Sequence, residues 1–296
     1  MSRPRSLHTA FGLTIRSEIA LLELPGGSGE PDVEISIGAV RDVARADAWT
    51  VIAAPNDVRG WIPAGGAFRV RDGREIVIDP AHDADARALR LGIVGPLLGV
   101  ILAQRGKFVL HASTVSIDGR AVAFSGPSGR GKSTLTAALA HAGHPLIADD
   151  MTVIDTARER PIVQPGFPRV KLWPDSAAAL AHDVDELPLL HPDRSKRSLQ
   201  LESRYQSEPL ELARCYLLED AEEESTSELS PREVIVALIG CTYQAAWLHE
   251  TGASGANLIH CAALARSGVV RRLGRRRSFD VLDDVIRFIE ADVRGG

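Results

Sequence analysis

Apolar and polar residues alternate, or gather in β-branched runs, along the first third of the chain. This pattern predicts short β-strands, because successive side chains of a strand point to opposite faces of a sheet. Turn residues such as Pro25-Gly26-Gly27 and Asp72-Gly73 separate the runs. The predicted strands are Gly12–Arg16, Val33–Ile37, Trp49–Ile52, Phe68–Arg71 and Glu75–Asp79. Residues 1–85 are therefore expected to form a small β-rich N-terminal domain.

The pattern changes near Asp83, where Ala and Leu become frequent and predict a long helix. The elements expected from there are a helix into Arg105, strands Lys107–Ile117 and Arg120–Ser125, a helix Lys132–His141 and a buried strand Pro145–Ala148. Asp118-Gly119 between the first two strands is a strong hairpin signal. Strand, loop, helix and strand in this order predict an α/β core within residues 86–296.

Two further helices and a loop are expected downstream. Glu219–Ser230 is acidic and Ser-rich, which is typical of a solvated loop. Ser230, Pro231 and Glu233 form the pattern of a capped helix start, so a helix should run from there to about Cys241. Ser278–Glu290 has the spacing of a final amphipathic helix.

Composition indicates a soluble globular protein. The 296 residues have a mass of 31.8 kDa, which fits two domains, with 45% apolar and 25% charged residues. The net charge of −5 provides no overall positive field for nucleic acid or an anionic membrane, so neither partner is expected. The three cysteines, Cys215, Cys241 and Cys261, show no Cys-x-x-Cys spacing and are expected to be reduced core residues.

The chain is expected to be cytoplasmic. Its N-terminus has no apolar segment of the kind that a signal peptide needs. The uncharged apolar stretch Leu91–Gln104 has 14 residues, fewer than the roughly 20 that span a bilayer. A buried helix is therefore expected at this stretch.

The strongest chemical signal is a complete G-x-x-x-x-G-K-[ST] phosphate-binding loop. Its residues are Gly126, Pro127, Ser128, Gly129, Arg130, Gly131, Lys132, Ser133 and Thr134. Glycines allow backbone N–H groups to face an anion, and the following helix N-terminus favours negative charge. Lys132 would reach the β and γ phosphates and the Ser133 hydroxyl would bind Mg²⁺. Only four of the 34 basic residues are lysines, and one of them stands in this loop.

Two adjacent carboxylates and a histidine lie near the loop in sequence. Asp149 and Asp150 end the strand that follows the loop helix, where they could bind Mg²⁺ and accept a proton from an attacking hydroxyl. His111 lies in an apolar strand one element before the loop. On its own such a histidine is more often a core or edge residue than a catalytic one.

The run from His111 to Asp150 resembles the C-terminal catalytic domain of HPr kinase/phosphorylases. It contains His-Ala-Ser-Thr-Val, a Gly-bearing hairpin, the phosphate loop and Ala-Gly-His-Pro-Leu-Ile-Ala-Asp-Asp. The match is tight over these 40 residues. Weaker resemblance extends from about Leu89 through Phe167–Asp175 to the end, and looks like the shorter, divergent HPr-kinase-like proteins of peptide-modifying gene clusters.

The resemblance implies an α/β fold: a P-loop kinase core of HPr kinase type over residues 86–296, with the β-rich domain in front of it. It implies a kinase that uses ATP and Mg²⁺ to phosphorylate a Ser or Thr hydroxyl of a peptide or protein, such as a lasso-type precursor peptide. It also implies a homo-oligomer. The β-rich domain could then recognise the acceptor.

The resemblance also implies roles for individual residues. Asp149 is expected to be the general base, with His111 and Lys132 as further catalytic residues. Asp150 is expected to bind metal together with Ser133. Because neighbouring residues of a strand point in opposite directions, the division of roles between the two aspartates stays open.

Two departures from the family favour a kinase without phosphorylase activity. The bifunctional enzymes carry a Leu-Glu-x-Arg-Gly-x-Gly stretch, whose glutamate helps to hold the metal, and a later Arg-Pro-Gly-Arg-Asn loop. The corresponding region here is Pro165–Asp175, with Lys171 and Trp173, and neither motif is present. A small-molecule kinase with the same site and a non-enzymatic ATP-sensing regulator remain the alternatives.

Two basic segments are left over. Lys196-Arg197 could close over the nucleotide or the acceptor, although a solvated loop is the more common outcome for such a pair. The cluster Arg271–Arg277 contains five arginines and could contact nucleic acid or an acidic peptide. A solvated cluster is expected there, because no nucleic-acid-binding motif accompanies it.

Overall fold

The computed structural model describes residues 5–191 and 194–295, with the backbone alone at residue 194. The chain divides into two compact units. The first holds the chain up to Lys107 and short later pieces, chiefly Gln244–Asn257. The second holds Phe108–Leu189, Ser195–Tyr243 and the chain from Leu258 onward.

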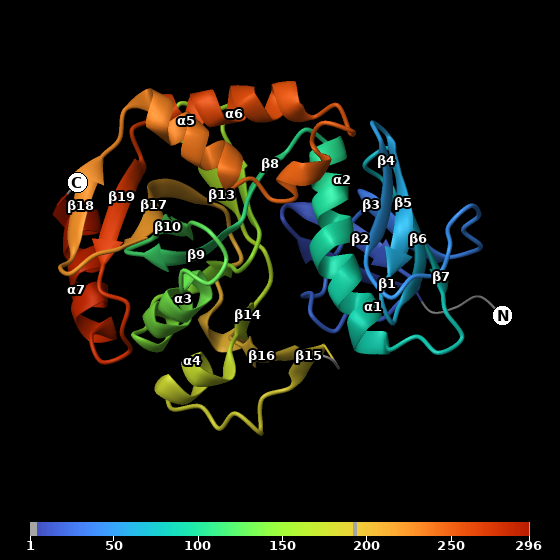
Figure 1. The fold of residues 1–296 in the computed structure, drawn as a ribbon, viewed down its shortest axis with the longest axis horizontal. Coiled ribbons are helices and arrows are strands. Elements are labelled where there is room, and N and C mark those ends of the chain that lie inside the picture. The colour runs from blue at the N-terminus through green and yellow to red at the C-terminus, as the bar shows by residue number, and fades with distance from the viewer. Residues whose placement is uncertain (1–4, 192–193, 296) are drawn as a thin grey trace. The chain divides into compact units, whose positions relative to one another are not determined.

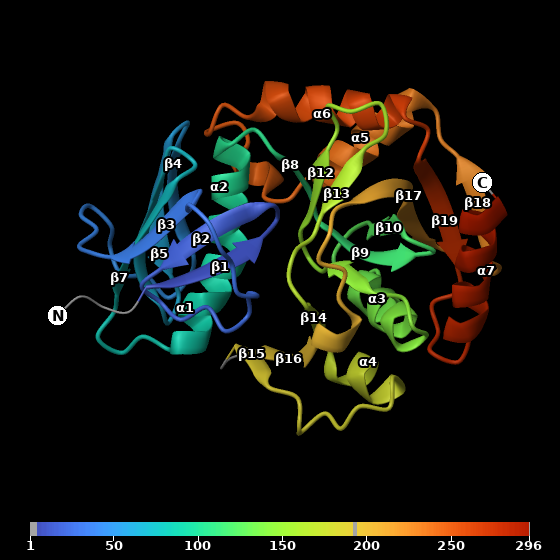
Figure 2. The same ribbon diagram turned by 180° about the vertical axis from the view of Figure 1, so that it is seen from behind.

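In the described part of the first unit, seven strands form one sheet with the order β1-β2-β3-β7-β6-β5-β4 (Figure 2). The strands are β1 Ser6–Ala10, β2 Leu13–Ser17, β3 Val33–Ile37, β4 Thr50–Ala54, β5 Asp57–Ile62, β6 Gly66–Arg71 and β7 Glu75–Pro80. The five predicted strands are confirmed within one or two residues, and β1 and β5 are additional.

A long apolar helix packs on this sheet. It runs from Ala86 to Gln104 as α1 Ala86–Gly92, the π-helical turn η1 Ile93–Leu97 and α2 Leu98–Gln104. Pro96 has no N–H to donate, and the helix is wound more widely around it. The helix begins at Ala86, before the apolar stretch that starts at Leu91, and belongs to the first unit.

This helix is also the one element of the described residues that is long and apolar enough to cross a membrane, and 67% of its most apolar window is buried inside the chain. Its residues Leu97, Leu98 and Ile101 are completely buried. The expected buried helix is therefore confirmed. Burial, rather than the shortness expected from the sequence, is what distinguishes it from a membrane span.

The second unit is built around a mixed sheet of nine strands among the residues described. Its path is β11-β9-β10-β17-β13-β12-β8. Strand β19 lies beside β17, and β18 lies beside β19 (Figure 1). The strands are β8 Phe108–Leu110, β9 Ala112–Ile117, β10 Arg120–Ser125, β11 Leu146–Ala148, β12 Thr152–Asp155, β13 Ile162–Gln164, β17 Leu210–Asp220, β18 Ser225–Glu228 and β19 Val270–Arg275. A small sheet contains β14 Arg169–Leu172, β15 Leu189–His191 and β16 Arg194–Gln200.

Helices cover both faces of the nine-stranded sheet. They are α5 Pro231–Gly240 and the later part of α6 Ser254–Arg266 on one face, and α3 Lys132–His141 and α7 Leu282–Gly295 on the other. The chain also forms α4 Pro174–Ala179, which packs on the small sheet, and the short turns η2 Glu202–Arg204 and η3 Ala245–Trp247. Ala121 and Ala123 of β10 face α5 and the later part of α6, whereas Val122 and Phe124 face α3 and α7. Because β10 is buried on both faces of the sheet, its successive residues Ala121–Phe124 are apolar instead of alternating with polar ones.

Two consecutive strand pairs of this sheet, β9–β11 and β8–β12, form a β-ribbon that is bent where one pair meets the other. β9 pairs antiparallel with β11, and β8 pairs antiparallel with β12. His111 lies at the bend between β8 and β9, and Asp149 and Asp150 lie at the bend between β11 and β12. The predicted strand Lys107–Ile117 is therefore interrupted at His111. His111 and the aspartate pair are therefore neighbours, because both strands of the ribbon bend at the same place.

The predicted turn and helix signals are confirmed with local corrections. Asp118 and Gly119 have φ values of 49° and 75°, as a tight hairpin turn requires. The acidic segment after Glu219 is not simply a loop, because Ser225–Glu228 forms β18 at the sheet edge. The final helix begins at Leu282 rather than Ser278. All three cysteines are described and none is disulfide-bonded; Cys215 and Cys261 are buried, and Cys241 is half-buried.

The capping box at the start of α5 is present as predicted. The Ser230 hydroxyl accepts a hydrogen bond from the Glu233 N–H, and the Glu233 carboxylate accepts one from the Ser230 N–H. The Ser230→Ala substitution is expected to lower the free energy of unfolding by about 1 kcal/mol. Urea denaturation measures the change, with exposed Ser207→Ala as the matched control. Equal stabilities of the two variants would contradict a stabilising cap.

Candidate active site

The phosphate loop connects the carboxyl end of β10 to the N-terminus of α3. Gly126, Gly129 and Gly131 have φ values of 147°, 83° and 77°, a region that side chains disfavour. Gly131 is the N-cap of α3 and has no side chain to occupy the first-turn N–H groups. These amides and the helix dipole therefore form an anion-binding site. Pro127 and Ser128 are exposed at the tip of the loop.

Lys132 is folded back onto its own loop. Its ammonium donates to the carbonyl oxygens of Gly126 at 2.8 Å and Pro127 at 3.1 Å, and the residue is only 6% exposed. Burial lowers the pKa of Lys132. The ammonium thus occupies the loop's interior, where it would meet the phosphates of a nucleotide.

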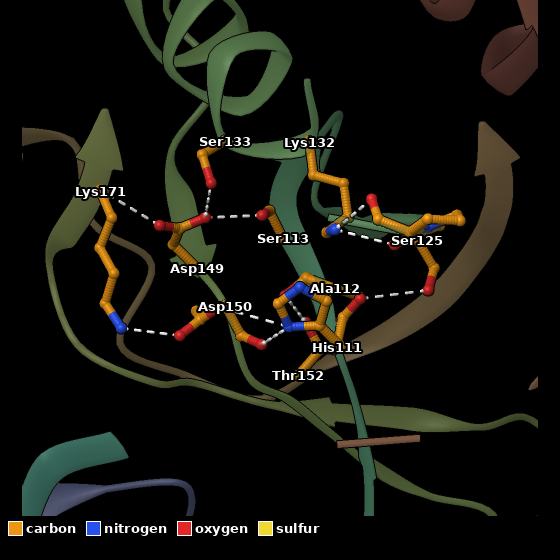
Figure 3. Close-up of polar contacts among 12 residues, drawn as sticks. His111, Ala112, Ser113, Ser125, Lys132, Ser133, Asp149, Asp150, Thr152 and Lys171 are labelled. Atoms are coloured by element: carbon orange, nitrogen blue, oxygen red, sulfur yellow. Dashed lines mark hydrogen bonds and ion pairs between the residues drawn. The ribbon is translucent and has the colours of Figure 1, made fainter. Parts of the chain in front are cut away.

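Asp149 contacts the loop through Ser133. Its Oδ1 accepts hydrogen bonds from the hydroxyls of Ser133 at 2.8 Å and Ser113 at 2.6 Å (Figure 3). Its Oδ2 accepts from the backbone N–H of Lys171 at 2.8 Å. Asp149 is 6% exposed, so these three donors hold its carboxylate in one orientation.

Asp150 points away from Asp149, toward His111 and Lys171 (Figure 3). Its Oδ2 accepts from the Lys171 ammonium at 2.7 Å, and its Oδ1 lies 3.3 Å from the Nδ1 of His111. Burial would raise the pKa of Asp150, but the charge of Lys171, followed by that of His111, outweighs burial and lowers it to about 2. The carboxylate is therefore ionised at neutral pH.

Both the ring and the backbone of His111 are hydrogen-bonded at the bend of the ribbon. Its Nδ1 lies 3.1 Å from the backbone oxygen of Asp150, to which it donates in the tautomer that carries the Nδ1 proton. Its backbone oxygen accepts from the Ser125 hydroxyl at 3.2 Å, and its N–H donates to Cys241 O at 2.7 Å. Burial lowers the pKa of His111. The histidine is thus placed beside Asp150, as the resemblance implies.

Lys171 is a site residue to which the sequence assigns no role. Its backbone N–H holds Asp149 while its ammonium holds Asp150, so one residue of β14 contacts both carboxylates. Burial would lower the pKa of Lys171, but the charge of Asp150 outweighs it and raises the pKa. The available signal was the scarcity of lysine in an arginine-rich chain.

Two arginines of the cluster expected to be solvated, Arg275 and Arg277, instead contact the phosphate loop. Arg275 is 4% exposed and donates from Nη2 to the carbonyl of Arg130 at 2.6 Å. Arg277 donates to the carbonyl of Gly129 at 2.7 Å. A Cβ on Gly131 would lie 2.7 Å from the Arg275 guanidinium, so a larger residue there would displace this side chain in addition to straining the backbone. The two arginines are positioning residues for the loop.

The Arg275→Met substitution is expected to weaken ATP binding by about tenfold, because the loop loses a charge-assisted hydrogen bond that orders it. Calorimetric titration with ATP measures the effect, and circular dichroism checks the fold. Arg277→Met is the matched control and should change affinity only a few-fold, because Arg277 contacts the loop from the surface. Wild-type affinity in Arg275→Met would contradict the positioning role.

The other predicted residues are distributed as follows. The Thr134 hydroxyl lies 2.9 Å from that of Ser176 in α4 and does not join the aspartates. Lys196 and Arg197 lie in strand β16 rather than in a loop. The Lys196 ammonium lies 5.0 Å from the centroid of the Trp173 ring.

The donor set fits a magnesium ion bound with a nucleotide. Mg²⁺ in such sites typically takes one or two carboxylates and completes its shell with phosphates and water. Ser133 and Asp149 supply a hydroxyl and a carboxylate oxygen 2.8 Å apart at the mouth of the loop. Within residues 5–191 and 194–295, no cluster of three or more His, Cys, Asp or Glu side chains offers a cage made by protein alone.

The fold resembles solved structures of known proteins. The chain is similar to a solved structure described as the Hpr(Ser) kinase/phosphatase from Coxiella burnetii, with 14% identity and a TM-score of 0.34. The match covers 63% of this chain and 94% of that chain. No protein-family description matches the chain, and no curated protein matches it. At this identity and TM-score, the function is argued from the geometry of the site.

Proposed function

We propose that this protein is an ATP-dependent kinase that transfers the γ-phosphate to a Ser or Thr hydroxyl of a peptide or protein. The observation that carries the proposal is the contact between Ser133 of the phosphate loop and Asp149, with Asp150 and His111 directly beside them. This arrangement supplies phosphate-binding groups, metal ligands and a proton acceptor within one set of contacts.

The loop amides and Lys132 would bind the nucleotide phosphates. The Lys132 ammonium would exchange the carbonyls of Gly126 and Pro127 for β and γ phosphate oxygens. The Ser133 hydroxyl and the Asp149 carboxylate would hold Mg²⁺. Magnesium neutralises phosphate charge that develops during transfer.

The contacts favour a division of roles opposite to that implied by the family resemblance. Asp149 is buried and bound to Ser133, as a carboxylate on the metal side of a phosphate loop should be. Asp150 faces away from Ser133, and its side chain is 27% exposed, so an acceptor hydroxyl can approach it. We therefore assign Asp150 as the proton acceptor and Asp149 as the metal ligand.

The transfer step follows from this division. The acceptor oxygen forms a bond to the γ-phosphorus, the bond from that phosphorus to the bridging oxygen of ADP breaks, and the hydroxyl proton passes to Asp150. His111 and Lys171 hold the Asp150 carboxylate in place from two sides. A fixed carboxylate needs no reorientation at the moment of transfer.

The choice of a peptide or protein as acceptor rests on the family resemblance. A lasso-type precursor peptide is one example of such an acceptor. The test is incubation of the purified chain with Mg-ATP and serine peptides, free serine and simple alcohols, followed by mass spectrometry. A phosphoryl group added to peptides, and absent with Lys132→Met, supports the proposal. Phosphorylation of small molecules alone would replace it by a small-molecule kinase. ATP binding without turnover would replace it by a nucleotide sensor.

A further inference from the structure

Three of the chain's four lysines lie around the aspartate pair. Lys132 belongs to the phosphate loop, and Lys171 is neutralised by Asp150 at 2.7 Å. Lys196 differs from both, because no carboxylate pairs with it among the residues that the structure describes. Its ammonium instead lies over the ring of Trp173, 5.0 Å from the centroid. Among the described residues around the aspartates, Lys196 is thus a cation outside the phosphate loop that an incoming anion could bind.

The strand pair β14–β16 determines where this cation lies. Lys171 pairs with Ser198 and Leu172 pairs with Arg197 in antiparallel register. Continuation of this register places Trp173 opposite Lys196, on the same face as Lys171. The opposite face carries Val170, Leu172 and Leu199, which are buried in an apolar cluster.

This face becomes more exposed with distance from the aspartates. The Lys171 side chain is 16% exposed where it contacts Asp150, whereas Trp173, two residues further on, is 49% exposed. A polar and aromatic surface therefore leads from solvent to the carboxylate that would accept the acceptor's proton.

The charge of Lys196 also acts on the catalytic groups. Burial lowers the pKa of Lys132, and the charge of Lys196 contributes to the lowering. For Asp150, burial raises the pKa, and Lys196 adds to the larger effects of Lys171 and His111 that lower it. The charge of Lys196 is therefore felt at the carboxylate that the acceptor hydroxyl has to reach.

We propose that Trp173 and Lys196 form the binding site for the acceptor, and that the acceptor is an acidic peptide. The Lys196 ammonium pairs with a carboxylate close to the phosphorylated Ser or Thr, and the Trp173 ring packs against the adjoining peptide. This inference rests on the proposed kinase function. A charge-assisted hydrogen bond to a carboxylate is stronger than an exposed cation–π contact, so Lys196 can leave the ring when the peptide binds.

A carboxylate of the acceptor suits Lys196 better than a nucleotide phosphate. The loop amides and Lys132 already supply the phosphate-binding groups. Lys196 comes from the strand beside Lys171, whose ammonium contacts Asp150, the aspartate that faces away from Ser133. The acceptor hydroxyl has to reach Asp150, so the peptide must lie next to this strand.

The test compares two sets of serine peptides that differ only near the serine, with Asp and Glu in one set and Asn and Gln in the other. Wild-type kcat/KM is expected to be about tenfold higher for the acidic set, through a lower peptide KM. Lys196→Met should remove this difference while the KM for ATP stays within a few-fold, and Lys196→Arg should keep it. Lys196→Glu should favour peptides with Lys beside the serine.

One control and two variants of Trp173 complete the design. Lys107→Met removes an exposed lysine of the first unit and should leave the peptide preference unchanged. Trp173→Ala should raise the KM for both peptide sets, whereas Trp173→Phe should raise it less. Circular dichroism and ATP affinity verify that each variant is folded.

Three results would overturn the inference and leave the kinase assignment in place. These are equal use of both peptide sets by wild type, an acidic preference that Lys196→Met retains, and a Lys196→Met effect on the KM for ATP alone. Failure of wild type to phosphorylate any peptide while it binds ATP would instead overturn the proposed function together with the inference.

Discussion

The Asp150→Asn substitution is expected to lower the rate of phosphoryl transfer by about 10²–10⁴-fold, the usual contribution of a positioned base. The affinity for Mg-ATP should stay within a few-fold of wild type, because Asp150 does not contact Ser133 or the phosphate loop among the described contacts. Single-turnover transfer and a paired titration of Mg²⁺ and ATP measure the two quantities separately.

Asp149→Asn is the matched control for this prediction. Its carboxylate accepts from Ser133, so loss of the charge should weaken ATP binding and its dependence on Mg²⁺ together. If Asp149→Asn kept Mg-ATP affinity and lost only transfer, while Asp150→Asn lost Mg²⁺ dependence, the roles would be those that the family resemblance implies. Near-normal transfer in both variants would remove the pair from the mechanism.

The Lys132→Met substitution is expected to weaken ATP binding by at least about tenfold, because the loop amides alone do not match the charge of the β and γ phosphates. Methionine preserves most of the unbranched side chain and removes the donor that now contacts the carbonyls of Gly126 and Pro127. Calorimetry measures the affinity, and ATP should raise the melting temperature of wild type much more than that of the variant.

Lys107→Met provides the comparison for Lys132→Met, since it removes an exposed lysine outside the second unit. Its ATP affinity should equal that of wild type. Wild-type affinity in Lys132→Met itself would show that the glycine-rich segment is not a nucleotide-binding loop, and the kinase proposal would fail with it.

The sequence predicted correctly those helix ends that are determined by residues within a few positions of them. The phosphate-loop helix begins at Lys132 and ends at His141 as expected, because glycines precede and follow it. The capping box at Ser230 starts α5 for a similar reason. In both cases residues within a few positions of the boundary supply the stabilising groups.

Features that depend on contacts with another strand were missed. Gly60 argues against a strand in the sequence, yet in β5 it allows the Thr50 carbonyl to lie 1.8 Å from where a Cβ would be. In the sequence, Arg275 has the pattern of a surface residue. In the structure, the pairing of β19 with β17 places it beside the phosphate loop, where it donates to the carbonyl of Arg130. No local pattern in the sequence contains either contact.

The sequence predicted which residues come together at the site, but not which side chains contact one another there. His111, the phosphate loop and the two aspartates do meet, because the chain bends at the same level on both strands of the ribbon. The direction of each carboxylate depends on the bend itself, and Lys171 enters from another sheet. Spacing along the chain carries no information on either point.

The backbone of Asp150 has an evolutionary consequence. Its φ of 72° lies in the left-handed region, where Gly, Asn and Asp are tolerated and β-branched residues are strongly disfavoured. Among these three, aspartate alone provides a carboxylate for Lys171 and His111. Selection for activity should therefore leave one residue type at this position, whereas a relative that has lost transfer could change to Asn or Gly without straining the backbone there. The residue found there would thus distinguish active from inactive members of any lineage that shares this bend.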